Sequence, residues 1–130
     1  MTTVLVVEDN PANMTLAVFL LESAGHRVLS AIDAEAGLTL ARVEQPDLIL
    51  MDIQLPGMDG LEATGVLKAS EETRAIPVIA LTALAMKGDE ERIRAAGCDG
   101  YIAKPMAYKE FLATVAAQLA QAPTGAPRGE

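Results

Sequence analysis

The sequence predicts an α/β fold, in which a doubly wound parallel sheet of five strands is covered by helices on both faces. Five short apolar runs recur along the chain, and segments with helical spacing separate them. Most of the runs do not alternate apolar with polar residues, which is typical of strands that are buried on both faces. Because strands that alternate with helices usually pair in parallel, these observations favour a parallel, doubly wound sheet.

The apolar runs consist mainly of branched aliphatic residues, which suit a buried sheet. The predicted strands are Val4–Val7, Val28–Ala31, Leu48–Met51, Val78–Leu81 and Tyr101–Ala103. Hydrophobic residues make up 51% of the chain, but it contains only two Phe, two Tyr and no Trp. The core must therefore be built from aliphatic residues, Met and Ala.

Between the runs, apolar residues recur every three or four positions, as they do on the buried side of a helix. The stripes are Met14, Ala17 or Val18 and Leu21; Leu38 and Ala41; and Tyr108, Phe111 or Leu112, Val115 and Leu119. Two further helices are expected around Ala63–Leu67 and Glu90–Ala96. The pattern predicts one helix after each strand.

Residues that start and stop helices lie at the boundaries of these segments. Asn10 before Pro11 predicts an N-cap followed by proline at the first helical position. Asp59 and Glu62 have the spacing of a capping box. Two glycines stand where the first and fourth helices should end. These glycines are Gly25 and Gly97.

The length of the chain fits one domain. A chain of 130 residues buries about two-thirds of its surface on folding, which is enough for a core without disulfides or structural metal. We expect the folded domain to span residues 1–121. Residues 122–130 contain Pro and Gly without an apolar period, which predicts a flexible tail.

The composition excludes several classes of function. The net charge is −8 and Lys and Arg form no run, so direct binding of nucleic acid is not expected. Cys98 is the only cysteine, which fits a reducing compartment. The sequence has no signal peptide pattern and no apolar stretch long enough for a membrane. We therefore expect a soluble, cytoplasmic protein without membrane contacts.

Polar, reactive side chains follow four of the predicted strands. Glu8 and Asp9 come after the first strand, Asp52 after the third, Thr82 after the fourth and Lys104 after the fifth. Ligands of open parallel sheets bind beyond the carboxyl ends of the strands. We therefore expect these five side chains to meet at one edge of the sheet.

Taken singly, most of these residues have a simpler interpretation. Asp9 fits a helix cap, Glu8 a solvated turn, Thr82 an ordinary strand-end hydroxyl and Lys104 a surface lysine. Asp52 is harder to explain in this way, because it ends an apolar run and should be partly desolvated. A carboxylate there needs a cation, hydrogen bonds or a proton.

The combination points to phosphoryl transfer. Clustered carboxylates repel one another unless a hard cation lies among them, and Mg²⁺ prefers oxygen ligands. A lysine and Mg²⁺ together neutralise the oxygens of a transferring phosphoryl group. An aspartate can act as the nucleophile and form an acyl phosphate. The sequence thus predicts phosphoryl transfer onto Asp52.

Four motifs carry a resemblance to a known family. They are Val7-Glu8-Asp9-Asn10, the segment Pro46–Gly60, Leu81-Thr82-Ala83 and the segment Tyr101–Pro105. From Val4 to about Leu119, the chain resembles the CheY-like receiver domains of two-component response regulators. The stretch Ala85–Ile93 also resembles stand-alone cell-fate regulators of this family. The resemblance implies a flavodoxin-like fold with strand order 2-1-3-4-5.

The resemblance also implies a metal site. Asp52 would be the phosphoacceptor and, with Asp9 and the backbone carbonyl of Gln54, would bind Mg²⁺ directly. Glu8 would bind it directly or through water. Two variable positions beside the site are occupied by Gln54 and Leu84. We hypothesise that apolar Leu84 gives the hydrolytic water no anchor, so that the phosphorylated form is long-lived.

A conformational switch is implied as well. Lys104 would pair with a phosphoryl oxygen. The Lys-Pro sequence at the strand end by itself suggests a fixed turn, and a cis peptide bond before Pro105 would direct the lysine inward. Thr82 would hydrogen-bond the phosphoryl group and Tyr101 would turn inward from solvent. The face made by the fourth helix, the fifth strand and the fifth helix would then change its affinity for partners.

These implications describe a single-domain response regulator rather than an enzyme. It would receive its phosphoryl group from a histidine kinase or a histidine phosphotransferase and then bind a downstream protein. Two alternatives share parts of the pattern. A phosphatase of the haloacid-dehalogenase type needs a second acid two residues after the nucleophile, where this chain has Gln54. A flavin-binding electron carrier needs aromatic residues and a hydroxyl-rich phosphate loop, which the sequence lacks.

Overall fold

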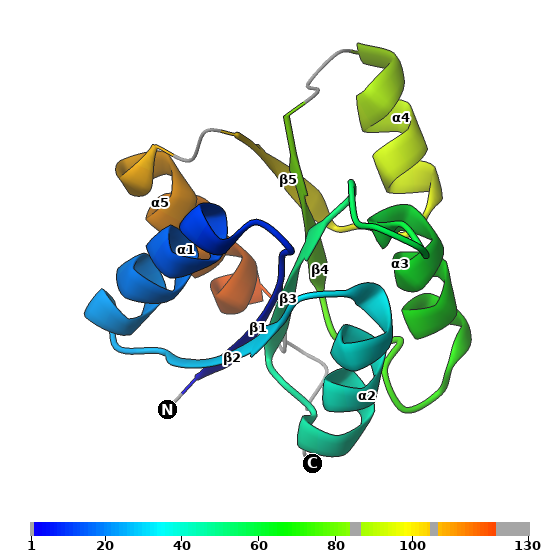
Figure 1. Ribbon diagram of the computed structural model, residues 1–130, viewed down its shortest axis with the longest axis horizontal. Helices are drawn as coiled ribbons and strands as arrows, with labels where there is room; N and C mark the ends of the chain where they lie inside the picture. Colours follow the sequence, from blue (N-terminus) through cyan, green and yellow to red (C-terminus); the bar gives the residue numbers. More distant parts are fainter. Residues whose placement is uncertain (1, 84–86, 105–106, 122–130) are drawn as a thin grey trace.

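The computed structural model describes residues 2–83, 87–104 and 107–121. Within these residues, five strands form one parallel sheet in the order β2-β1-β3-β4-β5 and alternate with five helices (Figure 1). The elements are β1 Thr3–Val7, α1 Pro11–Ser23, β2 Arg27–Ala31, α2 Ala34–Glu44, β3 Leu48–Asp52, α3 Gly60–Ala69, β4 Val78–Thr82, α4 Lys87–Ala95, β5 Gly100–Ala103 and α5 Tyr108–Gln121. The predicted fold class and strand order are confirmed.

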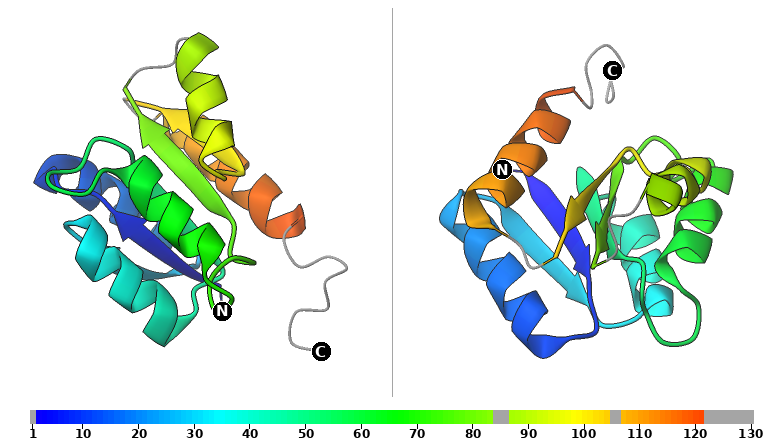
Figure 2. Two further views of the ribbon diagram at one scale, coloured as in Figure 1. Left: turned by 90° about the vertical axis from the view of Figure 1, so that its right-hand side faces the viewer. Right: turned by 90° about the horizontal axis from the view of Figure 1, so that it is seen from above.

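The sheet separates two apolar cores. Figures 1 and 2 show α1 and α5 on one face and α2, α3 and α4 on the other. Successive residues of a strand point to opposite faces. In β1, Val4 and Val6 accordingly pack in the core under α1 and α5, whereas Leu5 and Val7 pack in the core under α2 and α3.

The strands differ in how completely they are covered. All residues of β3 and β4 are buried, as are residues 4–7 of β1. The outer strands β2 and β5 each have exposed or half-buried positions. The predicted burial on both faces therefore holds for the three central strands, because only these have a neighbour on each side.

The predicted helix ends are confirmed by backbone geometry. The side chain of Asn10 accepts a hydrogen bond from the Asn13 N–H, and both hydrogen bonds of the capping box between Asp59 and Glu62 are present. Gly25 and Gly97 have φ angles of 94° and 108°, a conformation that favours glycine where helices end.

One helix boundary and one expected core residue differ from the sequence-based expectation. Helix α4 begins at Lys87, earlier than Glu90. Tyr108 was expected in the buried stripe of the last helix, but it is 56% exposed, the next two residues are also exposed, and the buried side of α5 begins only at Phe111. The hypotheses about Leu84, Pro105 and residues 122–130 concern positions outside the described residues.

Candidate functional site

The structure brings the predicted reactive residues to the carboxyl edge of the sheet. Glu8 follows β1, Asp52 and Thr82 are the last residues of β3 and β4, and Lys104 follows β5. The register of the parallel strands places these ends side by side, since Asp52 is paired with Leu81 and Thr82 with Ala103. Residues far apart in the chain thus share one site.

Three carboxylates form the centre of this site. Glu8, Asp9 and Asp52 each offer an oxygen, and these oxygens lie within 4.8 Å of one another. Glu8 and Asp52 are only 1% and 2% exposed, whereas Asp9 is exposed. The burial of Glu8 contradicts its interpretation as a solvated turn residue. Its side chain is buried because its carboxylate lies among the Asp9 and Asp52 carboxylates and the Lys104 ammonium instead of in solvent.

A lysine partly balances the negative charge. The Lys104 ammonium lies 2.9 Å from Glu8 Oε1 and 3.0 Å from Asp52 Oδ2, and it donates a hydrogen bond to Asp52. Asp52 Oδ1 accepts from the Gln54 N–H at 2.8 Å, and Glu8 Oε2 accepts from the Asn10 N–H at 3.1 Å. Backbone and lysine together orient both buried carboxylates.

The electrostatics follow from this crowding. Burial raises the pKa of Glu8, and the nearby Asp52 carboxylate raises it further, while Lys104 and the Asn10 N–H oppose the shift. Burial alone would lower the pKa of Lys104, but its contacts with Glu8 and Asp52 outweigh burial and raise it. The lysine therefore remains charged, and one positive charge faces three acids.

The donor set fits Mg²⁺. Its oxygens are the hard ligands that Mg²⁺ prefers, and the exposed Asp9 leaves one side open to the waters that Mg²⁺ usually retains. Glu8 Oε1 is buried, and the contact it makes within the described residues is the ion pair with the Lys104 ammonium at 2.9 Å, which leaves room for a further ligand on this oxygen. Such an oxygen can act directly or through a bridging water.

The loop between β3 and α3 is shaped by two glycines. Gly57 has a φ angle of 74°, which side chains rarely tolerate. Gly60 begins α3 so close to β3 that an added Cβ would lie 2.1 Å from the carbonyl oxygen of Asp52. The start of α3 therefore packs directly against the end of β3, where the Gln54 N–H donates to the Asp52 carboxylate.

The residues predicted to form the switch lie next to the carboxylates. Thr82 is fully buried at the end of β4. Tyr101 on β5 is half-buried, and its hydroxyl donates a hydrogen bond to the Glu90 carboxylate on α4. This bond raises the pKa of Tyr101, and partial burial adds to the effect. Sequence reasoning missed Glu90, which had only been placed in a helix.

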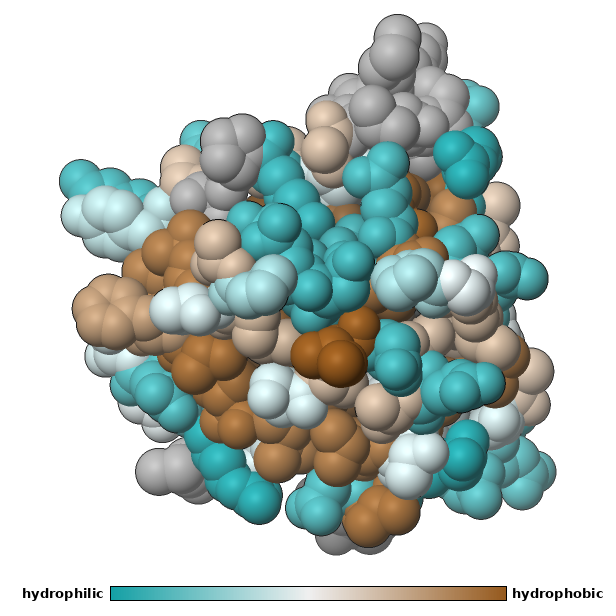
Figure 3. Space-filling model, in the orientation of Figure 1, coloured by the Kyte–Doolittle hydropathy of each residue, from teal (hydrophilic) through white to brown (hydrophobic). Residues whose placement is uncertain are grey.

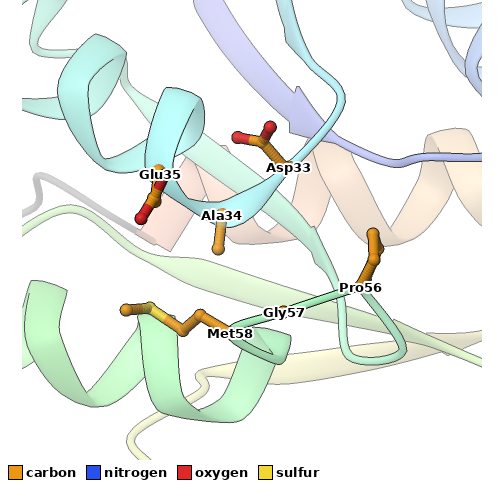
Figure 4. A pocket seen from close by; sticks show the side chains of 6 residues that line it. All are labelled: Asp33, Ala34, Glu35, Pro56, Gly57 and Met58. Carbon is orange, nitrogen blue, oxygen red and sulfur yellow. The ribbon is translucent and has the colours of Figure 1, made fainter.

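The surface around the site is shallow. A hollow of about 320 Å³ lies beside it, between the start of α2 and the β3–α3 loop, and none of the three clustered carboxylates lines it (Figure 4). It is lined by Asp33, Ala34, Glu35, Pro56, Gly57 and Met58. Of the three clustered carboxylates only Asp9 is exposed, so the cluster meets solvent on the side of Asp9 and not through this hollow.

Helix α1 presents an apolar surface next to this edge. Leu16 and Phe19 are 38% and 64% exposed and line a shallow groove with Pro11, Ala12 and Thr15. Figure 3 shows apolar side chains gathered over α1, beside the polar area at the carboxyl edge of the sheet. A helix with few polar residues on its exposed face is typical of a contact surface.

A parallel α/β sheet with acids, a hydroxyl and an ammonium at its carboxyl edge defines a regulator that signals by accepting a phosphoryl group. The chain belongs to the response regulator receiver domain family, whose model matches residues 4–116. Membership implies a kinase partner and makes the chain a signalling protein rather than an enzyme with a separate substrate. It thereby disfavours the phosphatase and flavin alternatives.

The chain is similar to a stand-alone regulator of polar differentiation. It is 52% identical over 119 residues to the response regulator DivK of Brucella ovis, and the match covers 92% of this chain and 97% of DivK. DivK of Brucella anthropi is 51% identical over the same length. The resemblance to stand-alone cell-fate regulators is thus confirmed.

Solved structures agree with this assignment. The receiver domain of the sensor histidine kinase PA1611 from Pseudomonas aeruginosa, which has a magnesium ion coordinated in its active site cleft, is 38% identical, with a TM-score of 0.86 and coverage of 92% of this chain and 98% of that one. The chemotaxis protein CheY4 of Vibrio cholerae is 26% identical, with a TM-score of 0.86 and coverage of 90% and 98%. Among the described residues, no helix combines the length and apolarity that a membrane span requires.

Proposed function

We propose that Asp52 accepts a phosphoryl group from a histidine kinase or histidine phosphotransferase in a Mg²⁺-dependent reaction. The single observation that carries this proposal is the position of the Asp52 carboxylate. It is 2% exposed and is held between the Lys104 ammonium and two further acids at the edge of the sheet. A buried carboxylate with a charged partner and an approach from solvent is suited to act as a nucleophile.

In the transfer, an oxygen of the Asp52 carboxylate forms a bond to phosphorus as the bond between phosphorus and the donor's histidine nitrogen breaks. The leaving imidazole keeps the electron pair and takes up a proton from water. Lys104, which already lies 3.0 Å from Asp52 Oδ2, pairs with a phosphoryl oxygen as charge accumulates there. The buried Thr82 hydroxyl, at the end of the next strand, donates to the same group.

Asp9, Asp52 and the backbone carbonyl of Gln54 would hold Mg²⁺ directly, and Glu8 directly or through water. When bound, the metal supplies positive charge that offsets the acids and the incoming phosphoryl group. The chain's own contribution is orientation, since the Gln54 N–H and the Lys104 ammonium fix the Asp52 carboxylate from two sides.

The phosphoryl group acts on the surface through Thr82 and Tyr101. As Thr82 is drawn toward the phosphoryl group, Tyr101 turns inward from the surface. The face formed by α4, β5 and α5 then changes its affinity for a downstream protein. The phosphoryl group biases this equilibrium because it binds one of the two states better.

The phosphodonor docks over α1. This helix adjoins the acidic edge, and the exposed Leu16 and Phe19 offer apolar contacts for the face of a donor helix. Such contacts would bring the phosphorylated histidine of the donor to Asp52. A small phosphodonor does not need this surface. Comparing phosphotransfer from a protein donor with labelling by a small phosphodonor therefore distinguishes an effect on docking from an effect on the chemical step.

Labelling with a phosphodonor tests the proposed function. Asp52→Asn should remove labelling by acetyl phosphate and by a kinase while the far-UV circular dichroism spectrum stays unchanged. Asp47→Asn, at an aspartate before β3 outside the carboxylate cluster, serves as the matched control and should still be labelled. Labelling of Asp52→Asn at the wild-type rate would refute the assignment of the phosphoacceptor.

A further inference from the structure

The hydrogen bond from Tyr101 to Glu90 connects the proposed switch with helix α4. Tyr101 is paired with Ala80 on β4, two residues before Thr82. Glu90 belongs to α4, the element that follows Thr82 along the chain. The hydrogen bond thus links the aromatic ring of the switch to one of the helices whose surface the switch changes.

The part of helix α4 whose side chains the structure describes, from Glu90 to Ala95, has little apolar packing to fix its position. Among its residues from Glu90 to Ala95, only Ile93 is buried. The helix lies at the margin of the molecule, beside the outer strand β5 (Figures 1 and 2). Where so few buried contacts hold a helix, a hydrogen bond to a charged acceptor contributes a larger share of its attachment.

Glu90 also has a second possible partner close by. Arg94 lies one turn further along α4, at a spacing that brings side chains of a helix together. Arg94 and Tyr101 line the same shallow groove beside α5. When Tyr101 turns inward, the Glu90 carboxylate loses its donor from β5 but can still pair with Arg94. The release of Tyr101 therefore does not leave an isolated charge on the surface.

We infer that Glu90 is a positioning residue that holds Tyr101 at the surface in the resting protein and so sets the threshold of the switch. The inference rests on the proposed function, because it specifies how the same switch is regulated. The carboxylate favours the resting position, and the phosphoryl group has to overcome this preference. A variant without the acceptor should populate the inward position before any phosphorylation.

The size of the effect follows from the kind of hydrogen bond. A bond to a charged acceptor is strong enough to change the ratio of the outward to the inward position about tenfold. Glu90→Ala should produce this shift. Glu90→Gln should produce a smaller one, because the glutamine carbonyl still accepts a hydrogen bond from the phenol. An intermediate effect of the conservative variant separates positioning from general damage to the helix.

Fluorine NMR of protein labelled with 3-fluorotyrosine measures the position of the ring. The chain has two tyrosines, so Tyr108→Phe identifies the Tyr101 signal. Beryllofluoride, a stable phosphoryl mimic, defines the signal of the switched state in the wild type. In Glu90→Ala without beryllofluoride, we expect the Tyr101 signal to move toward that value. Acetyl phosphate should also label Glu90→Ala several-fold faster than wild type.

Glu91→Ala is the matched control. It removes the same charge from the neighbouring position, about 100° around the helix, where it is exposed. The inference is refuted if Glu90→Ala leaves the Tyr101 signal at its resting value, or if Glu91→Ala moves it equally. In both cases a normal beryllofluoride response of the wild type would keep the proposed function intact. If the wild type does not respond to beryllofluoride, both the inference about Glu90 and the proposed function are refuted.

Discussion

Gly60 lies so close to Asp52 that a methyl group on its Cα would come within 2.1 Å of the Asp52 carbonyl oxygen. The neighbouring atom is backbone, which cannot move aside as a flexible side chain can. The start of α3 is thereby pressed against the end of β3, and the Asp52 side chain is presented at the edge of the sheet. A change at Gly60 should therefore affect both stability and labelling.

We predict that Gly60→Ala lowers the free energy of unfolding by about 3 kcal/mol, as expected for overpacking against backbone. Gly65→Ala in the same helix is the control. An added Cβ there has no atom within 4 Å, so the variant should be more stable than wild type by about 0.5–1 kcal/mol. Urea unfolding followed by circular dichroism measures both values. Equal effects of the two substitutions would contradict this account.

The three crowded carboxylates should make stability depend on magnesium. Asp9→Asn removes one negative charge from the cluster, so the variant should be more stable than wild type in chelator, by about 1 kcal/mol. Saturating Mg²⁺ should raise the melting temperature of wild type and change that of Asp9→Asn much less. Glu71→Gln, an exposed acid outside the cluster, should retain the full response to magnesium. Thermal unfolding with and without Mg²⁺ decides the matter, and an undiminished response of Asp9→Asn would exclude its role as a ligand.

The apolar surface of α1 should matter only for a protein donor. Phe19→Ser should slow phosphotransfer from a cognate kinase about tenfold, because a central aromatic contact is lost. Labelling by acetyl phosphate should be unchanged. Val43→Ser removes a similarly exposed apolar residue from α2 and should leave both rates unaffected. Equal slowing with both donors would assign Phe19 to the chemistry or the fold instead of docking.

Cys98 should be an unreactive thiol in the folded protein. Burial raises its pKa, and the Asp99 carboxylate adds to the shift, while a hydrogen bond to Thr64 and the Lys68 ammonium oppose it. At pH 8, a thiol reagent should therefore modify the native protein far more slowly than the urea-unfolded protein. Equal rates in the two states would contradict the burial of Cys98.

The same shift has a consequence for stability. The pKa of Cys98 is higher in the folded state than in the unfolded state. The contribution of the thiol to the free energy of unfolding is therefore fully present below the unfolded pKa, about 8.5, and is lost as the pH rises through the folded pKa. The difference in unfolding free energy between wild type and Cys98→Ala should stay constant from about pH 6 to 8 and decrease above that range. Denaturant titrations of both proteins across this range measure it. If the unfolding free energy of wild type minus that of Cys98→Ala increased with pH instead, the predicted direction of the effect would be wrong.

The lifetime of the phosphorylated form should be long. This prediction rests on the sequence alone, because apolar Leu84 offers the hydrolytic water no polar anchor. Decay of the labelled protein measures the lifetime, and loss within seconds in the absence of a phosphatase would refute it. Leu84→Asn should shorten the lifetime several-fold.

The sequence by itself determined the elements and the reactive residues. Several features can be recognised from residues that are close together in the sequence. They are the apolar runs, the helix caps at Asn10 and Asp59, and the acid at the end of the third strand. The family motifs added the expected roles of these residues. However, each strand predicted from these local patterns was one residue shorter than the strand in the structure. The patterns also did not distinguish the central strands of the sheet from the outer ones.

Only the tertiary structure decided the environment of each side chain. It buried Glu8, exposed Tyr108 and placed Lys104 3.0 Å from Asp52, a residue 52 positions away in the chain. It also joined Tyr101 to Glu90, two residues with no common motif. These relationships depend on which strands and helices become neighbours, and the energy of burial and charge is set by such neighbours rather than by residues adjacent in sequence.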